Sequence, residues 1–238
     1  MSVYRKELRL RSKDVDMFRR LRTSTLFELL QEASIRHTEE LGMGREKTLD
    51  RGLLWVLAQQ SAEIRRMPVY DEELVLRSWP GATMHYFFPR FYALDTADGE
   101  PLVRASALWG LMSGEARKLV SPEPWGIVIE GETGEEAIPL PSAPRRLDCG
   151  GSRLFTVPYS YVDLNGHMNN TRYFDLMEDT LPDAAQGRAL AAVSMEYAHE
   201  ARLGETVELR WGQRDSEYYL TGQTDKTLFR MSLRYRDE

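Results

Sequence analysis

Residues 25–33 read Thr-Leu-Phe-Glu-Leu-Leu-Gln-Glu-Ala and predict the helix around which the rest of the fold is arranged. Thr25 and Glu28 have the spacing of a capping box, in which each side chain bonds the other residue's amide. Apolar residues then follow at helical intervals: Leu26, Leu29, Leu30 and Ala33. Leu41-Gly42 has the composition of a helix end. We therefore expect one helix with a single apolar face near the start of the chain.

Strand patterns lie on both sides of this helix. Val3–Leu10 precedes it, and four strand candidates follow it, namely Leu53–Arg66, Glu73–Trp79, His85–Asp95 and Leu102–Ser113. Pro89 has no amide hydrogen to give to a ladder, which predicts an edge or bulged strand at that point. Asp98-Gly99 predicts a hairpin turn between the last two strands.

The second half of the chain repeats this order. We expect a strand near Phe155–Tyr161, a helix from about Asn170 to Thr180 that stops at Pro182, and four strands at Leu190–Glu200, Thr206–Gln213, Glu217–Thr224 and Leu228–Tyr235. Phe27-Glu28-Leu29-Leu30 resembles Phe174-Asp175-Leu176-Met177, 174 − 27 = 147 positions later. Leu74–Arg77 resembles Val207–Arg210, 207 − 74 = 133 positions later. The two offsets are close enough to indicate an internal repeat with small loop changes.

The segment between the two halves is rich in proline. Five of the eleven prolines lie between residues 121 and 150, at positions 122, 124, 139, 141 and 144. Proline excludes a sheet interior or a long helix, so 121–151 is predicted as a linker, with Trp125–Ile129 packed on a neighbour. The chain thus divides into 1–120, 121–151 and 152–238. The pattern predicts an α+β protein of two tandem hotdog domains, each an antiparallel sheet wrapped around a helix, which form a pseudo-dimer by pairing sheet edges.

Composition excludes several classes of protein. The 31 Lys+Arg against 37 Asp+Glu give a net charge of −6, which argues against nucleic acid as the main partner. The longest apolar run, Leu53–Ala58, is far too short for a membrane helix, and no secretory signal is visible at the first residues. The single cysteine, Cys149, excludes an internal disulfide and a cysteine zinc site. These features favour a cytoplasmic setting.

The densest polar cluster is Tyr161–Asn170, in which Asp163, Asn165 and His167 alternate just before the second predicted helix. Asp and Asn also favour turns and helix caps, so each residue alone has a structural explanation. A calcium loop is excluded because the glycine stands fourth instead of sixth and Phe174 stands where the bidentate glutamate belongs. No metal or cofactor is implied. A helix start offers free amides for a carbonyl oxygen, and a carboxylate, a carboxamide and an imidazole can handle water and protons.

A second polar contribution is expected from Met195–Glu200. Glu196 and Glu200 would share one face of the predicted strand, while His199 faces the other way. An inward Glu200 would be a candidate base, because a buried carboxylate needs a partner. Both glutamates could equally face solvent, and spacing alone leaves this open.

The motif around Tyr161–Asn170, with Tyr173 and Glu178 after it, resembles the signature of the acyl-acyl-carrier-protein thioesterases, the plant plastid enzymes and their bacterial relatives. The resemblance continues in other segments: Leu30-Gln31-Glu32-Ala33, Leu54-Trp55-Val56, Arg104–Trp109 and Met195-Glu196-Tyr197. It implies hydrolysis of a fatty acyl thioester in fatty acid biosynthesis, without a cofactor.

The same resemblance implies which residues form the site. The family's catalytic Asp, Asn, His and Glu match Asp163, Asn165, His167 and Glu200. The cysteine of plant members would fall at Ala201, so a cysteine mechanism is not implied here. Hotdog thioesterases that act on coenzyme A esters share the D-x-N-x-H-x-N-N pattern. An acyl-CoA thioesterase and a non-catalytic acyl-binding hotdog protein therefore remain alternatives.

The repeat predicts that only one copy keeps the chemistry. The offset of 147 places Asp163, Asn165 and His167 on Asp16, Phe18 and Arg20, and the offset of 133 places Glu200 on Met67. We expect one site in the second half, with an acyl pocket supplied by the first-half helix and Leu53–Gln60. The expected partner, acyl carrier protein, is acidic like this chain, so docking needs a local basic patch. The candidate pairs and clusters are Arg19/Arg20/Arg22, Arg65/Arg66, Arg117/Lys118 and Arg145/Arg146. The sequence leaves the oligomeric state open, a homodimer included.

Overall fold

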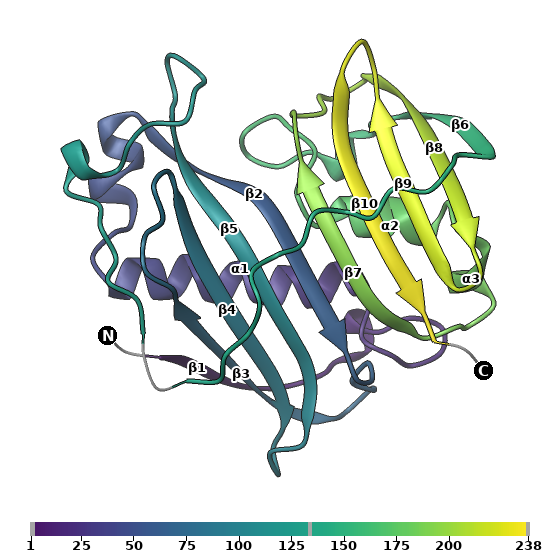
Figure 1. The fold of residues 1–238 in the computed structure, drawn as a ribbon. Helices are drawn as coiled ribbons and strands as arrows, with labels where there is room; N and C mark the ends of the chain where they lie inside the picture. Colours follow the sequence, from purple (N-terminus) through teal and green to yellow (C-terminus); the bar gives the residue numbers. More distant parts are fainter. Residues whose placement is uncertain (1–2, 133–134, 237–238) are drawn as a thin grey trace.

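A single antiparallel sheet of ten strands forms the body of the molecule, and its strand order is symmetric about the centre. A computed structural model describes residues 3–132 and 135–236. The order is β1-β3-β4-β5-β2-β7-β10-β9-β8-β6 (Figure 1). Each first-half strand therefore has a counterpart at the same distance from the β2–β7 seam. This is the arrangement of two tandem hotdog domains joined edge to edge, as the sequence predicts.

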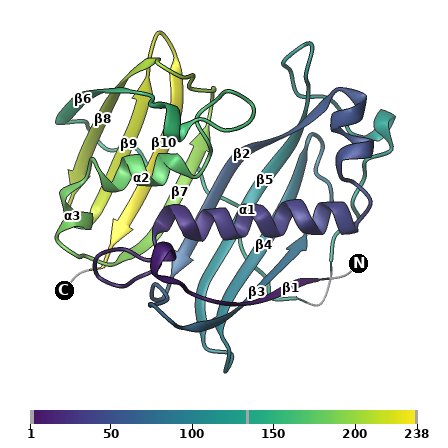
Figure 2. The same ribbon diagram turned by 180° about the vertical axis from the view of Figure 1, so that it is seen from behind.

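The first half contains five strands and one long helix. The strands are β1 (Tyr4–Arg9), β2 (Leu53–Ile64), β3 (Glu73–Pro80), β4 (Phe87–Thr96) and β5 (Pro101–Ser113). Helix α1 (Thr23–Glu40) crosses one face of these strands (Figure 2). Short 3-10 turns occupy Ser12–Asp14, Arg45–Lys47, Leu49–Arg51 and Glu123–Trp125. The five predicted strands are confirmed, with ends that move by a few residues.

The second half has the same parts with shorter helices. They are β6 (Gly151–Thr156), a 3-10 turn (Tyr159–Tyr161), α2 (Arg172–Glu178), α3 (Pro182–Ala185), β7 (Leu190–Tyr197), β8 (Thr206–Arg214), β9 (Glu217–Gln223) and β10 (Thr227–Tyr235). The prediction of a strand over 155–161 is wrong at its end, because the strand stops before Pro158, which cannot donate to a ladder. Among the described residues, no helix is long and apolar enough to cross a bilayer.

Helix α1 begins three residues earlier than the capping box predicts, since its N-cap is Arg22 instead of Thr25. The residue before it is Arg22, whose extended backbone donates its amide to the carbonyl of Asp14 and whose side chain does not cap the helix. Thr25 consequently lies inside the first turn. The helix start is thus set by the loop before it instead of by local capping. The predicted end is confirmed, since Leu41 caps the helix and Gly42 adopts φ +68°.

Pro89 lies in β4, which is an interior strand, but the last pair of β3 with β4 is Pro80 with Arg90, so Pro89 itself pairs only with β5. The prediction of an edge is therefore confirmed at this residue and wrong for the strand as a whole. The Pro89 carbonyl accepts from the Gly81 amide at 2.9 Å, beyond the last residue of β3. In a strand the nitrogen and carbonyl of one residue point to the same side, so the missing amide hydrogen faces the end of β3. The ladder therefore loses nothing at this proline.

One hydrophobic core runs through both halves. Phe27 of α1 and Phe174 of α2, which the offset of 147 makes equivalent, stack with ring centroids 4.0 Å apart. Both are fully buried. Strand β2 pairs with β7 only over Gln59–Glu63, so its first residues pair with β5 alone. The two helices meet on the core side, and their stacked rings seal the seam from that side.

The linker crosses the face of the sheet opposite the helices (Figure 1). Ile127 and Ile129 are 0% and 4% exposed and pack with Leu53, Phe88 and Leu111, which confirms the predicted packing of Trp125–Ile129. Further along, the linker bonds the second half through Arg145 to Glu217. The linker is thus part of the packed structure of both halves.

Candidate functional site

The segment before α2 forms a closed loop whose shape depends on backbone hydrogen bonds. Val162 pairs with Met168, and the amide of Asp163 donates to the carbonyl of His167 at 2.9 Å. Gly166 turns the chain with φ +80°, a conformation that glycine adopts without strain. The loop ends directly at the start of α2.

Two of the candidate residues lie in the first part of this loop. The Oδ1 atom of Asp163 accepts from the Asn165 amide at 2.8 Å, which is an Asx turn. The Asn165 side chain is exposed. At least one carboxylate oxygen of Asp163 therefore stabilises the turn, as the structural alternative to a catalytic role predicts.

The other two candidate residues meet. His167 Nε2 lies 3.2 Å from Oε2 of Glu200, and the other carboxylate oxygen, Oε1, accepts from the Arg117 guanidinium. His167 has 19% of its side chain exposed and Glu200 has 39%, so the pair is reachable from solvent. An imidazole beside a carboxylate can take a proton from water and pass it on.

Glu200 reaches this position from a loop and not from a strand face. Strand β7 ends at Tyr197, and the amides of Ala198 and His199 both donate to the Leu228 carbonyl, which breaks the alternation. The expectation that Glu196 and Glu200 share a strand face is therefore wrong. Glu196 lies instead on the sheet and pairs with Arg230 at 2.8 Å.

Most amides at the helix start are already bonded within the chain. The amides of Met168 and Asn169 donate to the carbonyls of Ala201 and Tyr161, and that of Arg172 donates to Asn169. The Thr171 amide donates to the Asn169 side chain. Among the described residues, the Asn170 amide has no acceptor, so it is one donor in this stretch that a carbonyl oxygen could use.

Two first-half side chains contact this helix start, and a third reaches it through Tyr197. Gln60 of β2 donates to the Tyr197 hydroxyl at 2.5 Å, and that hydroxyl donates to the Asn170 carbonyl at 2.8 Å. Burial raises the pKa of Tyr197 well above its usual range, so its hydroxyl keeps the proton that it donates. Gln31 of α1 accepts from the Asn170 side chain at 3.5 Å, and Glu28 contacts Arg172. The first half thus holds the residue that carries the unused amide.

The sequence did not predict the contacts that Arg117, Gln60 and Tyr197 make at this site. It indicated Arg117 only as half of a basic docking pair with Lys118, and Gln60 only as the end of the strand expected to line the acyl pocket. Gln60 has the clearest sequence signal of a buried polar contact, because it is a polar residue in a strand that begins with an apolar run. In the structure it is only 6% exposed. Tyr197 lies in Met195-Glu196-Tyr197, a segment of the family resemblance, but the sequence alone indicates no role for its hydroxyl. Arg117 gives no local signal, since its contact with Glu200 joins residues 83 positions apart.

The first half contains the same loop without the same chemistry. Val15 pairs with Leu21, the Asp16 amide donates to Arg20, and Oδ1 of Asp16 accepts from the Phe18 amide at 2.8 Å. Each bond has its counterpart 147 residues later. Arg20 takes the place of His167 and donates to the Gly187 carbonyl, while the buried Met67 takes the place of Glu200. The equivalences expected from the sequence are confirmed in the backbone.

A cavity of about 270 Å³ lies beside this first-half loop, opposite Glu178, which corresponds to Gln31 by the same offset. Burial raises the pKa of the Glu178 carboxyl and outweighs the hydrogen bonds from Thr23 that lower it, while nearby Asp175 adds to the rise. The folded state therefore holds this proton to a higher pH than the unfolded chain does. The free energy of unfolding therefore falls as the pH rises from the ordinary pKa of a glutamate to the raised pKa of Glu178, because the unfolded chain loses this proton first.

Replacing Glu178 by glutamine should therefore raise the melting temperature at about pH 8 and leave it nearly unchanged at about pH 4, where the parent carboxyl is protonated in both states. Thermal unfolding of both proteins at the two pH values checks this. Asp179→Asn, at the exposed next position, serves as the control. An equal gain for Glu178→Gln at both pH values would contradict the burial argument.

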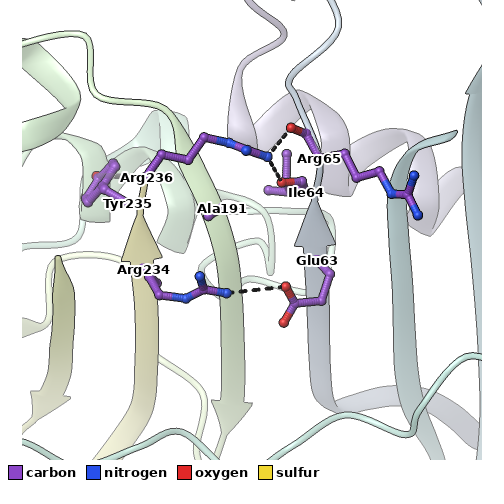
Figure 3. Close-up of a pocket in the computed structure, with 7 residues that line it drawn as sticks. All are labelled: Glu63, Ile64, Arg65, Ala191, Arg234, Tyr235 and Arg236. Atoms are coloured by element: carbon purple, nitrogen blue, oxygen red, sulfur yellow. Dashed lines mark hydrogen bonds and ion pairs between the residues drawn. The ribbon is translucent and has the colours of Figure 1, made fainter. Parts of the chain in front are cut away.

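A recess of about 500 Å³ lies at the other end of the seam (Figure 3). There Arg236 donates to the carbonyls of Ile64, at 2.7 Å, and Arg65, and Arg234 lies 3.6 Å from Glu63. None of the four candidate residues lines it. Within residues 3–132 and 135–236, no three His, Cys, Asp or Glu side chains come together to hold a metal ion.

Two family models match almost the whole chain. The acyl-ACP thioesterase N-terminal domain matches residues 1–124, and the acyl-ACP thioesterase C-terminal domain matches residues 146–236. Curated relatives include the chloroplast acyl-acyl-carrier-protein hydrolase FATB3 of Cuphea viscosissima, 25% identical over 86% of this chain and 53% of the relative. The chloroplast dodecanoyl-acyl-carrier-protein hydrolase of Cinnamomum camphora is 25% identical over 87% of this chain and 58% of its own. The chain spans about half the length of the curated relatives it matches.

Solved structures share the fold over nearly the full length. An acyl-ACP thioesterase from Bacteroides thetaiotaomicron superposes with a TM-score of 0.86 at 21% identity and covers 98% of both chains. The 12:0-ACP thioesterase from Umbellularia californica superposes with a TM-score of 0.84 at 20% identity, covering 99% of this chain and 98% of its own. At these identities the likeness establishes the tandem hotdog fold.

Proposed function

Because the chain belongs to the acyl-ACP thioesterase family, we propose that it hydrolyses fatty acyl thioesters of acyl carrier protein to free fatty acid and carrier protein. The observation that carries this proposal is the contact of His167 with Glu200 at 3.2 Å beside the start of α2. A non-catalytic acyl-binding protein has no need for an imidazole and a carboxylate placed together and open to solvent. A cytoplasmic setting, supported by the single cysteine, is part of the proposal.

The proposed reaction uses water as the nucleophile. The His167–Glu200 pair takes a proton from water as the water oxygen attacks the thioester carbon. The carbonyl oxygen becomes an oxyanion, for which the Asn170 amide is the proposed donor. When the tetrahedral intermediate collapses, the carbon–sulfur bond breaks and the proton passes to the thiolate. Asp163 and Asn165 shape the loop that carries His167, and the exposed Asn165 side chain can contact the substrate.

The first half is proposed to bind the acyl chain and the second half to perform the chemistry. Gln31 and Glu28 of α1 contact the start of α2, so an acyl group held at Asn170 would lie against the first-half helix. Two exposed basic residues near the His167–Glu200 pair could bind the carrier. Lys118 directly follows Arg117 in the chain, and Arg202 forms a backbone bridge with His167. These two cations could meet acidic side chains of the carrier.

Hydrolysis assays with one acyl chain on acyl carrier protein and on coenzyme A test the proposal. We expect a higher kcat/KM for the carrier protein, with a loss of that advantage at high salt, because a protein partner uses charge contacts that salt screens. Reversal of charge in Lys118→Glu/Arg202→Glu should weaken carrier turnover and spare acyl-CoA turnover. Equal, salt-insensitive rates on both carriers would favour an acyl-CoA thioesterase. Binding without turnover would favour the acyl-binding protein.

A further inference from the structure

We propose that Arg117, which the first half supplies from the turn after β5, is a positioning residue for the Glu200 carboxylate. This inference rests on the proposed function, in which His167 and Glu200 form the working pair. The turn after β5 and the end of β7 lie at the same end of the sheet (Figure 1). The Arg117 guanidinium spans from one half to the other and bonds Oε1 of Glu200.

Arg117 occupies a backbone position that does not suit its residue type. Its φ is +53°, in the left-handed region that favours glycine and asparagine and costs other residues about 1 kcal/mol or more. The turn itself is well fixed, because Ser113 exchanges backbone bonds of 2.9 Å with Arg117 and Lys118, and its hydroxyl accepts from Ala116. Strain held in a rigid turn beside an active site is a known mark of function. Glycine would adopt this backbone without strain, so what arginine adds at this position is its side chain, which bonds Glu200.

The need for such a residue follows from how Glu200 is placed. Glu200 lies in a loop, with 39% of its side chain exposed, so little packing fixes its rotamer. The guanidinium holds Oε1, and Oε2 is then turned toward His167 Nε2. A charge-assisted bond to a planar guanidinium fixes direction as well as distance. Without it, Glu200 can rotate away into solvent.

The turn between β8 and β9 offers a comparison in the same chain. Asp215 in this turn also has a left-handed backbone, with φ +54°, and is exposed. This turn lies at the opposite end of the sheet from the end of β7, because each neighbouring strand from β7 to β8 reverses direction. Asp215 therefore provides a control with the same backbone region and no place at the site.

The test uses Arg117→Asn, because asparagine tolerates the left-handed backbone and the variant should keep its fold. We expect kcat on an acyl carrier protein thioester to fall about ten-fold or more with KM nearly unchanged, since only the placement of the base is disturbed. Arg117→Lys should retain part of kcat. Added guanidinium should restore part of the activity of Arg117→Asn, while sodium chloride at equal ionic strength should not. Asp215→Asn, at the exposed left-handed position between β8 and β9, should leave kcat unchanged.

A second arm asks whether Arg117 acts through Glu200. In a Glu200→Gln background, Arg117→Asn should lower kcat no further. NMR of the His167 ring nitrogens, which needs no turnover, should show a changed tautomer ratio in Arg117→Asn. Unchanged kcat and ring signals in Arg117→Asn, or an equal fold-loss in the Glu200→Gln background, would overturn the inference. A parent without thioesterase activity would instead overturn the proposed function, and the NMR arm would still decide the positioning role.

Discussion

Glu200→Gln should lower kcat on a carrier-bound acyl thioester by about a hundred-fold or more, with little change in KM. Glutamine keeps the shape of the side chain and can still accept from Arg117, but it cannot take a proton from His167 or water. Because Glu200 is partly exposed, the melting temperature should stay close to that of the parent. Steady-state kinetics and thermal unfolding of the two proteins check this expectation.

Glu196→Gln is the matched control for this result. Glu196 lies four residues earlier, on β7, and pairs with Arg230 at 2.8 Å instead of with His167. Its replacement should leave kcat nearly unchanged. A Glu200→Gln protein that keeps full kcat, or a Glu196→Gln protein that loses as much, would contradict the assignment of the base.

The largest expected effect on stability comes from the stacked rings at the seam. Phe27→Ala should reduce the free energy of unfolding by about 3–5 kcal/mol, because it removes a fully buried ring and leaves a cavity. The remaining partner, Phe174, loses a stacked neighbour at 4.0 Å. For a chain of this size the melting temperature should fall by about 10 °C.

The same experiment shows whether the halves unfold together. Since the core is continuous across α1 and α2, calorimetry of Phe27→Ala should give one transition, moved as a whole. Tyr159→Ala, which truncates an aromatic ring that is 85% exposed, should leave that transition nearly in place. Two separate transitions, of which only one moves, would contradict a shared core.

The fold could be predicted from the sequence where the signal is local and periodic. Alternating residues such as Val207, Leu209 and Trp211 identify strands because one face of each is buried. The predicted ends of helices and strands are wrong where backbone hydrogen bonds to distant parts of the chain determine them. Asp14 accepts the amide of Arg22 and fixes the start of α1, and no pattern within the helix carries that information.

The site was only partly predictable for a related reason. The alternating polar residues around His167 are visible in the sequence, and the family resemblance indicated Glu200. The reasoning that placed Glu200 on a strand face failed, because β7 ends at Tyr197. Arg117 reaches the site from the other half of the chain. Such contacts depend on how the two sheets join, which a single sequence does not specify.

The central claim is that one of two structurally equivalent loops carries the chemistry. The most direct measurement compares kcat on an acyl carrier protein thioester for His167→Ala and for Arg20→Ala, at positions related by the offset of 147. We expect His167→Ala to lose about a hundred-fold or more, while Arg20→Ala, which loses its bond to the Gly187 carbonyl, keeps nearly the kcat of the parent. Equal losses in the two variants, or an active His167→Ala protein, would contradict the single site.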